Sequence, residues 1–364
     1  MDERVARLAG WGGGIAQSPT QIQVHLTNFC NLSCLFCPTR TLVREEDLKR
    51  ENELPLERWL SLIDESAGMG VREWHICGGG EPLFRPDALQ IMGHIKKAGL
   101  LGECITNGTF ISRDTAMQLV DAGWNKITIS LDSSDEQTHD SLRGVPGTFR
   151  RVKHGIACLA EAKKSLGRDR PQICIHAVIC NRNHDHIEDL ITFASKTGCN
   201  EVLINAMNIW SGKIKKLALG PRQVPGLYAH LKKAQAAAEE LQVSTNIPMF
   251  LDSDLFQSAN RMQDTFISDT GNLQAQEFWS IPCFHPWYNI SIFADGSAQP
   301  CFLLQEKGDS VACRSLAEVW HGNYFTRKRQ EIADRKLTDD CSRCNPWTLS
   351  ATRELREGLK GCAR

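Results

Sequence analysis

The residues best suited to chemistry are cysteines that lie unusually close together. Cys30, Cys34 and Cys37 form a C-x3-C-x2-C arrangement directly before Pro38. Cysteine thiolates hold iron–sulfur clusters, and a cluster with three protein ligands keeps one iron open for a further ligand. A zinc ion ordinarily takes four nitrogen or sulfur ligands, and this segment offers no fourth one. The spacing therefore favours a 4Fe–4S cluster over zinc or inert packed thiols.

A second set of cysteines lies near the end of the chain. Cys283 and Cys301 precede a C-x2-C pair, Cys341 and Cys344. Such a pair occurs both in zinc ribbons and in iron–sulfur sites, so the residues alone leave both metals open. The chain has 15 cysteines, and metal ligation is the favoured interpretation of that number in a reducing compartment.

The composition argues against several classes of function. The chain has 364 residues, and 42 lysines and arginines nearly balance 43 aspartates and glutamates. This balance does not favour nucleic acid or an anionic membrane as the main partner. The sequence shows no signal-peptide pattern and no apolar run long enough to span a bilayer. We therefore expect a cytoplasmic protein.

Short apolar runs alternate with amphipathic stretches over the first two thirds of the chain, which is the pattern of repeated βα units. The expected strands are residues 22–26, 73–77, 103–106, 126–131, 173–179 and 201–205. The expected helices are residues 56–66, 86–97, 113–122, 149–162, 186–197 and 224–241. Strands joined by crossover helices form parallel sheets, and six units are too few for a closed eightfold barrel. The pattern predicts an α/β fold with a partial (β/α)6 TIM-like barrel.

Three parts of the chain are expected. Residues 1–20 look like an irregular N-terminal extension, residues 21–245 form the barrel, and residues 246–364 form a small C-terminal α+β domain. Within the last part, residues 249–280 are polar and poorly periodic. An Asp295-Gly296 turn predicts a hairpin after residues 288–293, and helices are expected at residues 315–320 and 325–333.

The first cysteine segment resembles the signature of the radical S-adenosylmethionine (SAM) superfamily, since it follows a first strand and carries an aromatic residue, Phe36. In that family the open cluster iron binds SAM, and an electron from the cluster cleaves SAM to methionine and a 5′-deoxyadenosyl radical. The resemblance implies SAM and a SAM-binding 4Fe–4S cluster as cofactors. It also implies a flavodoxin- or ferredoxin-type electron donor.

Segments after the later strands resemble the SAM contacts of this family. Gly79-Gly80-Glu81-Pro82 looks like the motif that binds the methionine amino group, and Thr106-Asn107-Gly108-Thr109 is similar to a loop after the third strand. The resemblance assigns SAM contacts to Phe36, Gly79, Gly80, Glu81, Asn107, Ser130, Asp132, Arg143, Val178 and Met207. From the residues alone, Asp132 could equally cap a turn, and Val178 and Met207 could simply be core.

The C-terminal cysteines resemble a twitch domain, the short relative of the SPASM domain. This resemblance assigns Cys283, Cys301, Cys341 and Cys344 as ligands of one auxiliary 4Fe–4S cluster with no open iron, whose role would be electron transfer. Ser350 and Glu354 stand roughly where SPASM domains carry further cysteines. Cys313 and Cys362 are left over, and either could replace one of the four.

The resemblance predicts a radical SAM oxidoreductase that abstracts hydrogen from a small-molecule substrate. The first hypothesis is dehydrogenation of a sugar or an aminoglycoside-type natural-product intermediate, with the auxiliary cluster as electron acceptor. The alternatives are a ribosomal-peptide maturase, sulfur insertion from the auxiliary cluster, or a radical epimerase with a cysteine as hydrogen donor. Cys77 and Cys180 are the candidates for that catalytic thiol, because strand ends face the site in such barrels. A non-enzymatic metal-binding scaffold is disfavoured because the cysteines, Gly80 and Glu81 are all present.

Overall fold

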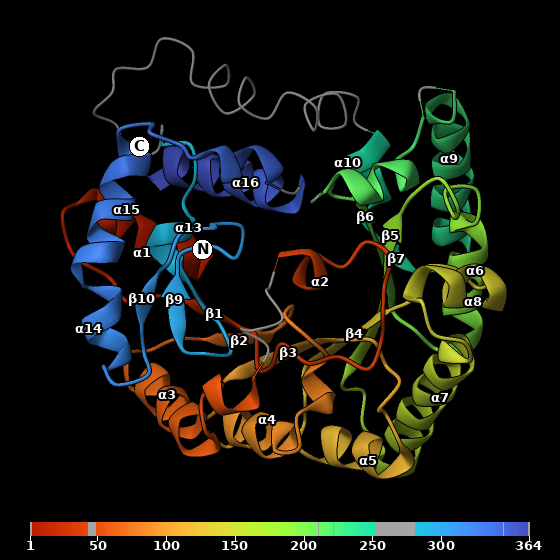
Figure 1. Ribbon diagram of the computed structural model, residues 1–364, viewed down its shortest axis with the longest axis horizontal. Coiled ribbons are helices and arrows are strands. Elements are labelled where there is room, and N and C mark those ends of the chain that lie inside the picture. Colours follow the sequence, from red (N-terminus) through yellow and green to blue (C-terminus); the bar gives the residue numbers. More distant parts are fainter. Residues whose placement is uncertain are drawn as a thin grey trace.

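The computed structural model describes residues 2–42, 49–209, 211–220, 222–251, 281–344 and 346–362. Within these residues the strands form one ten-stranded sheet in the order β10-β9-β8-β1-β2-β3-β4-β5-β6-β7. Figure 1 shows the sheet curving around a concave inner side, with helices along its outer side. The strands are β1 (Gln21–Val24), β2 (Glu73–Ile76), β3 (Leu101–Thr106), β4 (Lys126–Ser130), β5 (Gln172–Ile179), β6 (Glu201–Ala206), β7 (Ser244–Thr245), β8 (Asn289–Ile292), β9 (Ser297–Gln299) and β10 (Asp309–Ser310).

The strands from β1 to β7 pair in parallel, each with its neighbour, and the sheet stays open. The partial barrel expected from the sequence is therefore confirmed, and the six expected strands lie within a few residues of their predicted positions. The crossover helices are α3 (Leu56–Gly68), α4 (Ala88–Lys97), α5 (Arg113–Asp121), α6 (Glu136–Arg143), α7 (Thr148–Leu166), α8 (Ile187–Thr197) and α9 (Val224–Glu240).

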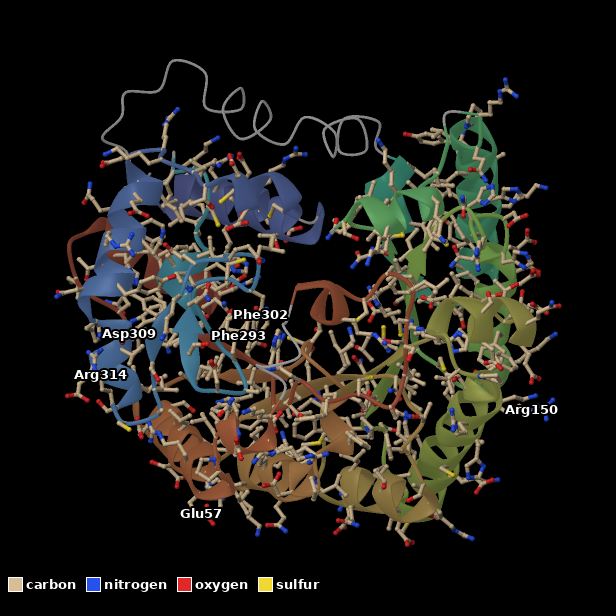
Figure 2. The ribbon with its side chains drawn as sticks, in the orientation of Figure 1. Glu57, Arg150, Phe293, Phe302, Asp309 and Arg314 are labelled. Atoms are coloured by element: carbon tan, nitrogen blue, oxygen red, sulfur yellow. The ribbon has the colours of Figure 1, made fainter. Side chains whose placement is uncertain are left out.

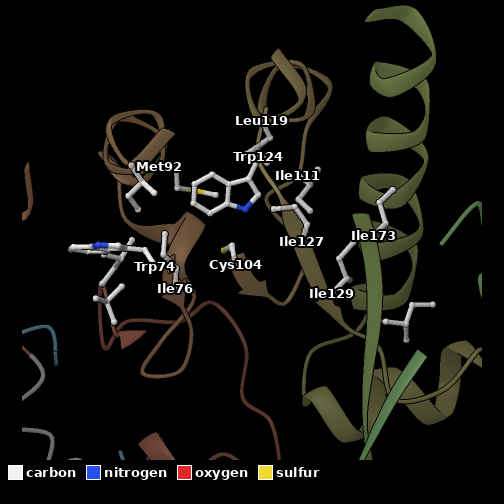
Figure 3. Packing of buried hydrophobic residues seen from close by; sticks show 14 of the residues in the cluster. Trp74, Ile76, Met92, Cys104, Ile111, Leu119, Trp124, Ile127, Ile129 and Ile173 are labelled. Atoms are coloured by element: carbon white, nitrogen blue, oxygen red, sulfur yellow. The ribbon is translucent and has the colours of Figure 1, made fainter. Parts of the chain in front are cut away.

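The core lies between the outer side of the sheet and these helices. On β2, Trp74 and Ile76 are fully buried in this layer, whereas Glu73 and His75 are half-buried on the other side of the sheet. Figure 3 shows Trp74 and Ile76 near Met92 and Cys104. Each fully buried side chain of this size contributes about 1.5–3 kcal/mol. Since alternate residues of a strand face opposite sides, this core holds the polar residues of β2 towards the concave side.

The structure corrects the expectation that residues 1–20 are irregular, because residues Glu3–Gly12 form helix α1. Asp2 accepts a hydrogen bond from the backbone N–H of Arg4 and so caps the helix. Val5 and Leu8 are buried in a cluster with Leu355 and Leu359 of α16 (Pro346–Cys362), a helix that the sequence analysis also missed. The two helices pack together from opposite ends of the chain, and each buries the apolar residues of one face in this cluster.

The C-terminal hairpin continues the barrel's sheet rather than forming a separate one. β8 pairs in parallel with β1, with Asn289 opposite Gln21, and β9 and β10 follow antiparallel. Helices α13 (His285–Tyr288), α14 (Leu316–Trp320) and α15 (Asn323–Ala333) flank it, close to the two helices predicted there. The domain boundaries given above remain predictions.

Most of the polar segment 249–280 lies outside the described residues, which end at Leu251 of helix α10 (Ile247–Leu251) on this side. Among the described helices, none combines the length and the apolar character that crossing a membrane requires.

Candidate functional site

The first three cysteines lie in a loop between β1 and α2 (Pro38–Leu42), at the end of the barrel where the parallel strands terminate. Cys30 is exposed, and Cys34 and Cys37 are half-buried. Although the residue is exposed as a whole, its sulfur is partly enclosed. Burial, the Glu81 carboxylate and the thiols of Cys34 and Cys37 together raise the pKa of Cys30 to about 11. The three cysteines thus lie in one short loop, with the Cys34 and Cys37 thiols near enough to affect the pKa of Cys30.

The end of helix α6 fixes the shape of this cysteine loop. The backbone N–H of Ser33 donates to the carbonyl of Arg143 over 3.1 Å, and that of Leu35 donates to the carbonyl of Leu142 over 2.9 Å. Gly144 ends the helix at a φ of 72°, and a Cβ on it would overlap the carbonyl oxygen of Ser33. Helix α6 was not among the helices predicted from the sequence. Its start is nevertheless marked by a recognisable cap, since Asp135 accepts a hydrogen bond from the N–H of Thr138.

We expect Gly144→Ala to reduce SAM cleavage by about 10- to 100-fold, because the new methyl group displaces the cysteine loop. Gly198→Ala is the matched control: Gly198 ends α8 at a φ of 75°, but nothing lies within 4 Å of its Cβ position. Both variants bear the cost of a left-handed alanine, about 1 kcal/mol. Rates of 5′-deoxyadenosine formation compare them. Equal losses in both would contradict a loop held by α6.

A glycine loop after β2 packs directly on the cysteine loop. The N–H of Gly80 donates to the carbonyl of Thr27 over 2.6 Å, and the N–H of Glu81 donates to that of Phe29 over 2.8 Å. A Cβ on Gly80 would overlap the carbonyl of Phe29, so only glycine fits there. Gly79 has a φ of 66°. The two glycines thus allow the backbones of the two loops to approach each other closely.

The Glu81 carboxylate is buried beneath this contact, with 2% of the residue exposed. One oxygen accepts from the hydroxyl of Thr106 over 2.5 Å, and the other accepts from the N–H of Asn107 over 2.6 Å. Burial raises the pKa of Glu81, and these hydrogen bonds oppose the rise. The residue therefore ties the loops after β2 and β3 together, and its contact with the amino group of SAM stays a prediction.

Asn107 extends the hydrogen bonds of Glu81 to the cysteine loop, where its side chain lies next to Cys30. Its side-chain amide donates to the side-chain oxygen Oδ1 of Asn31 over 2.8 Å and lies 3.9 Å from the sulfur of Cys30. The hydroxyl of Thr109 accepts from the amide of Asn31 and donates to Asn107. Asn31 was not among the site residues predicted from the sequence, although a side-chain amide directly after Cys30 was a usable signal.

Two residues assigned to SAM, Asp132 and Arg143, form a buried ion pair. Nε of Arg143 lies 2.7 Å from Oδ2 of Asp132, whose other oxygen accepts from the N–H of Val178 over 3.0 Å. The guanidinium lies 3.9 Å from the sulfur of Cys34 and 5.5 Å from the ring centre of Phe36. Burial raises the pKa of Asp132, and Arg143 counteracts this. The pair therefore places a fixed positive charge beside the cysteine loop.

The remaining assigned residues surround an apolar cluster behind this loop. Phe36, Leu142, Cys180 and Leu217 are buried in it, and Cys34, Val178 and Met207 are half-buried against it. Ser130 is half-buried at the end of β4, opposite His176 of β5. The structure thus brings Phe36, Val178 and Met207, three of the residues that the resemblance assigns to SAM, together beside Cys34.

The two candidate catalytic thiols differ in their access to the concave side. Cys180 is fully buried in the apolar cluster, whereas Cys77 is half-buried and follows β2 on the same side as His75. Burial raises the pKa of both thiols, that of Cys77 to about 12. Both therefore stay protonated, which is the form that donates a hydrogen atom. Their catalytic roles remain predictions, and Cys77 has the better access.

The second set of cysteines also comes together. Cys283, Cys301 and Cys341 are half-buried and Cys344 is buried. Burial, and after it the thiols of Cys344, Cys301 and Cys341, raise the pKa of Cys283 well above its usual range. Cys313 is exposed, and the side chain of Cys362 is outside the described part.

The donor chemistry of both sets fits iron–sulfur clusters. Four thiols in one set and three in the other are the ligands that such clusters use. In the described residues, no three histidine, cysteine or carboxylate side chains converge as ligands of a single ion do.

Three rings lie where the N-terminal and C-terminal parts meet. His25, after β1, stacks on Phe302 with ring centres 3.9 Å apart and meets the edge of Phe293 at 5.0 Å. Figure 2 shows Phe293 and Phe302 side by side near the middle of the molecule. Burial lowers the pKa of His25 to about 3, so the ring is neutral. Because Phe302 adjoins Cys301, these rings connect the barrel to the second cysteine set.

We expect acid to lower the stability of the protein through His139 of α6. The ring of His139 is fully buried, and its Nδ1 accepts a hydrogen bond from the N–H of Asp132 over 3.2 Å. Burial lowers its pKa from 6.5 to about 3, so the neutral ring's contribution is complete above about pH 6.5 and is lost as the pH falls towards 3. We expect the melting temperature to fall less between about pH 7.5 and 5.5 in His139→Gln than in the unmodified protein. The surface variant His94→Gln should behave like the unmodified protein. An identical fall in all three would contradict this.

Comparison with known proteins places two family models on the chain. Residues 24–194 match the radical SAM superfamily, and residues 283–345 match SPASM, an iron–sulfur cluster-binding domain. The first match contains the loops around Cys30, and the second contains all four C-terminal cysteines.

Named relatives match over different lengths. The AdoMet-dependent heme synthase of Methanosarcina barkeri is 32% identical over 184 residues, which is 50% of this chain and 49% of that protein. The PqqA peptide cyclase of Methylocella silvestris is 27% identical over 56% of this chain and 52% of its own length. The chain thus spans about half of each of these relatives. The PqqA peptide cyclase of Xanthomonas campestris is 25% identical over 85% of this chain and 76% of its own length.

Solved structures share the fold. Streptococcus suis SuiB bound to the precursor peptide SuiA has a TM-score of 0.65 and 17% identity, and covers 94% of this chain and 74% of its own. The anSMEcpe enzyme with bound AdoMet has a TM-score of 0.60 and 14% identity, and covers 95% of this chain and 98% of its own. At these identities the likeness concerns the fold alone.

Proposed function

We propose that this chain, which belongs to the radical SAM superfamily, modifies a peptide substrate by abstracting a hydrogen atom from it. The radical SAM domain binds SAM and a 4Fe–4S cluster, and the SPASM domain binds auxiliary clusters. Electron transfer from the cluster to bound SAM supplies the 5′-deoxyadenosyl radical for this step. The observation that carries the proposal is the alignment with a peptide cyclase along 85% of the chain, through both domains.

The residues of this chain would hold and orient the reactants. Cys30, Cys34 and Cys37 would bind the SAM-binding cluster, and the fixed charge of Arg143, held by Asp132, would lie beside it. The apolar residues behind the loop, among them Phe36, Val178 and Met207, would take the adenine and exclude water from it. The buried thiols around Cys283 would hold a cluster that accepts the electron left after hydrogen abstraction.

A peptide is favoured over the sugar expected from the sequence. The first hypothesis rested on the number of late cysteines, whereas the relatives that align with both domains are named peptide cyclases. The heme synthase match covers half of this chain, so it supports the shared radical chemistry more than a tetrapyrrole substrate. Sugar dehydrogenation stays the second candidate.

Mass analysis of anaerobic reactions tests this proposal. The reduced protein with SAM should convert a precursor peptide encoded near its gene to a product lighter by two hydrogen atoms, together with 5′-deoxyadenosine. The same reaction with aminoglycoside-type sugars is the comparison. A sugar product with unmodified peptides would overturn the peptide proposal and favour the second candidate.

A further inference from the structure

A group of exposed cations lies on three segments near the mouth of the barrel. They are Lys213, Lys215 and Lys216 on the 3₁₀ helix η4 (Gly212–Leu217), Arg182 after β5, and Arg222 before α9. Within the part of the chain that the structure describes, none of the five forms an ion pair with a carboxylate. No aspartate or glutamate occurs between Glu201 and Glu239, although the whole chain is nearly neutral. We call these five residues the basic patch.

Asn181 joins the three segments of the basic patch. Its N–H donates to the carbonyl of Leu217 over 3.0 Å, and its side-chain amide donates to the carbonyl of Lys216 over 2.8 Å. Its own carbonyl accepts from the side-chain amide of Gln223 over 3.4 Å. Arg182, Lys216 and Arg222 are direct chain neighbours of these anchored residues, so their charges gather around one point.

The basic patch lies directly outside the cysteine loop. Leu217, which ends η4, is buried in the apolar cluster that also contains Phe36 and Cys180 and touches Cys34. This apolar cluster therefore lies between the exposed lysines and Cys34, which would bind the SAM-binding cluster. An electron carrier seated on this surface would lie near that cluster without entering the concave side, where substrate binds.

We propose that the basic patch is the docking surface for a small acidic one-electron carrier protein of the flavodoxin type. This inference rests on the proposed function, which requires one electron for each SAM cleaved. The carrier gives one electron to the cluster bound by Cys30, Cys34 and Cys37 and leaves oxidised by one electron. Carboxylates on the carrier meet unpaired cations, and such complementarity mainly raises the association rate.

The nearest acidic side chains of the described chain set a limit to the basic patch. Asp185 and Glu188 are exposed at the start of α8, just beyond Arg182. Asp185 lies 3.6 Å from the ring of His186. The favourable surface is thus the side formed by η4 and Arg222, away from α8.

Two reductants separate docking from chemistry. The variant Lys213→Glu/Lys215→Glu/Lys216→Glu should form 5′-deoxyadenosine about tenfold more slowly with a reduced flavodoxin at low salt, and at an unchanged rate with dithionite. The rate of the unmodified protein with flavodoxin should fall as salt rises. Lys232→Glu/Lys233→Glu, on the exposed side of α9, is the matched control and should keep both rates.

A second variant, Arg182→Glu/Arg222→Glu, reverses the charge of the two arginines of the basic patch that lie outside η4. A loss of rate in this variant cannot come from local damage to η4. An unchanged flavodoxin-driven rate in both variants, or equal losses with both reductants in both, would overturn the docking surface. Direct binding of oxidised flavodoxin to each protein gives a readout independent of activity. If the unmodified protein cleaves no SAM with either reductant, the proposed function fails. The binding measurement then still shows whether the basic patch binds flavodoxin.

Discussion

Replacing Cys30, Cys34 and Cys37 together with alanine is expected to abolish SAM cleavage and to leave about four irons in the protein. The three N-terminal thiols share one loop, and Cys283, Cys301, Cys341 and Cys344 form a separate, partly buried set. Removing the first set therefore leaves the ligands of the second intact. Iron and sulfide analysis, together with 5′-deoxyadenosine formation on reduction, measures both effects.

The control for this variant is Cys158→Ala/Cys199→Ala. Both cysteines are buried on the outer side of the barrel and belong to neither set. The control should keep the full iron content and the full rate of cleavage. Continued cleavage by the triple variant would show that these cysteines are not the ligands that SAM cleavage needs.

Asp132→Ala is expected to destabilise the protein by about 3–5 kcal/mol and to stop SAM cleavage, because it leaves the buried Arg143 without its counter-charge. Arg143 also contacts Cys34 and ends the helix that fixes the cysteine loop, so the damage reaches the cluster. Thermal or denaturant unfolding of the cluster-loaded protein measures the loss of stability, and 5′-deoxyadenosine measures the loss of activity.

Asp135→Ala on the same helix is the matched control. Asp135 is exposed and caps α6, so its loss should cost about 1 kcal/mol. The double variant Asp132→Ala/Arg143→Met removes both charges and should regain part of the stability but not the cleavage. If Asp132→Ala costs no more than Asp135→Ala, the buried pair does not support the site.

Local patterns predicted much of this fold. The alternation of apolar residues on β2, with Trp74 and Ile76 outward, is a property of a few neighbouring residues, so the strand could be placed from the sequence. The cysteine spacing and the paired glycines before Glu81 are equally local. Each depends on chain geometry over a single turn or loop, which distant contacts hardly alter.

Features that depend on distant partners could not be predicted. Helix α1 packs against α16, more than three hundred residues later, and no pattern within either helix reveals that pairing. β8 joins β1 through pairs such as Ile22 with Ile290, which no pattern within either segment reveals. The Asp132–Arg143 pair is of the same kind: each residue was assigned to SAM separately, and only the fold shows that they bind each other.

The most direct test of the account is the product of SAM in the reduced, anaerobic protein, measured with its metal content. The account predicts about eight irons per chain, bound by the two cysteine sets, and 5′-deoxyadenosine and methionine formed only on reduction. Bound zinc in place of iron, or a full iron content without 5′-deoxyadenosine, would contradict it.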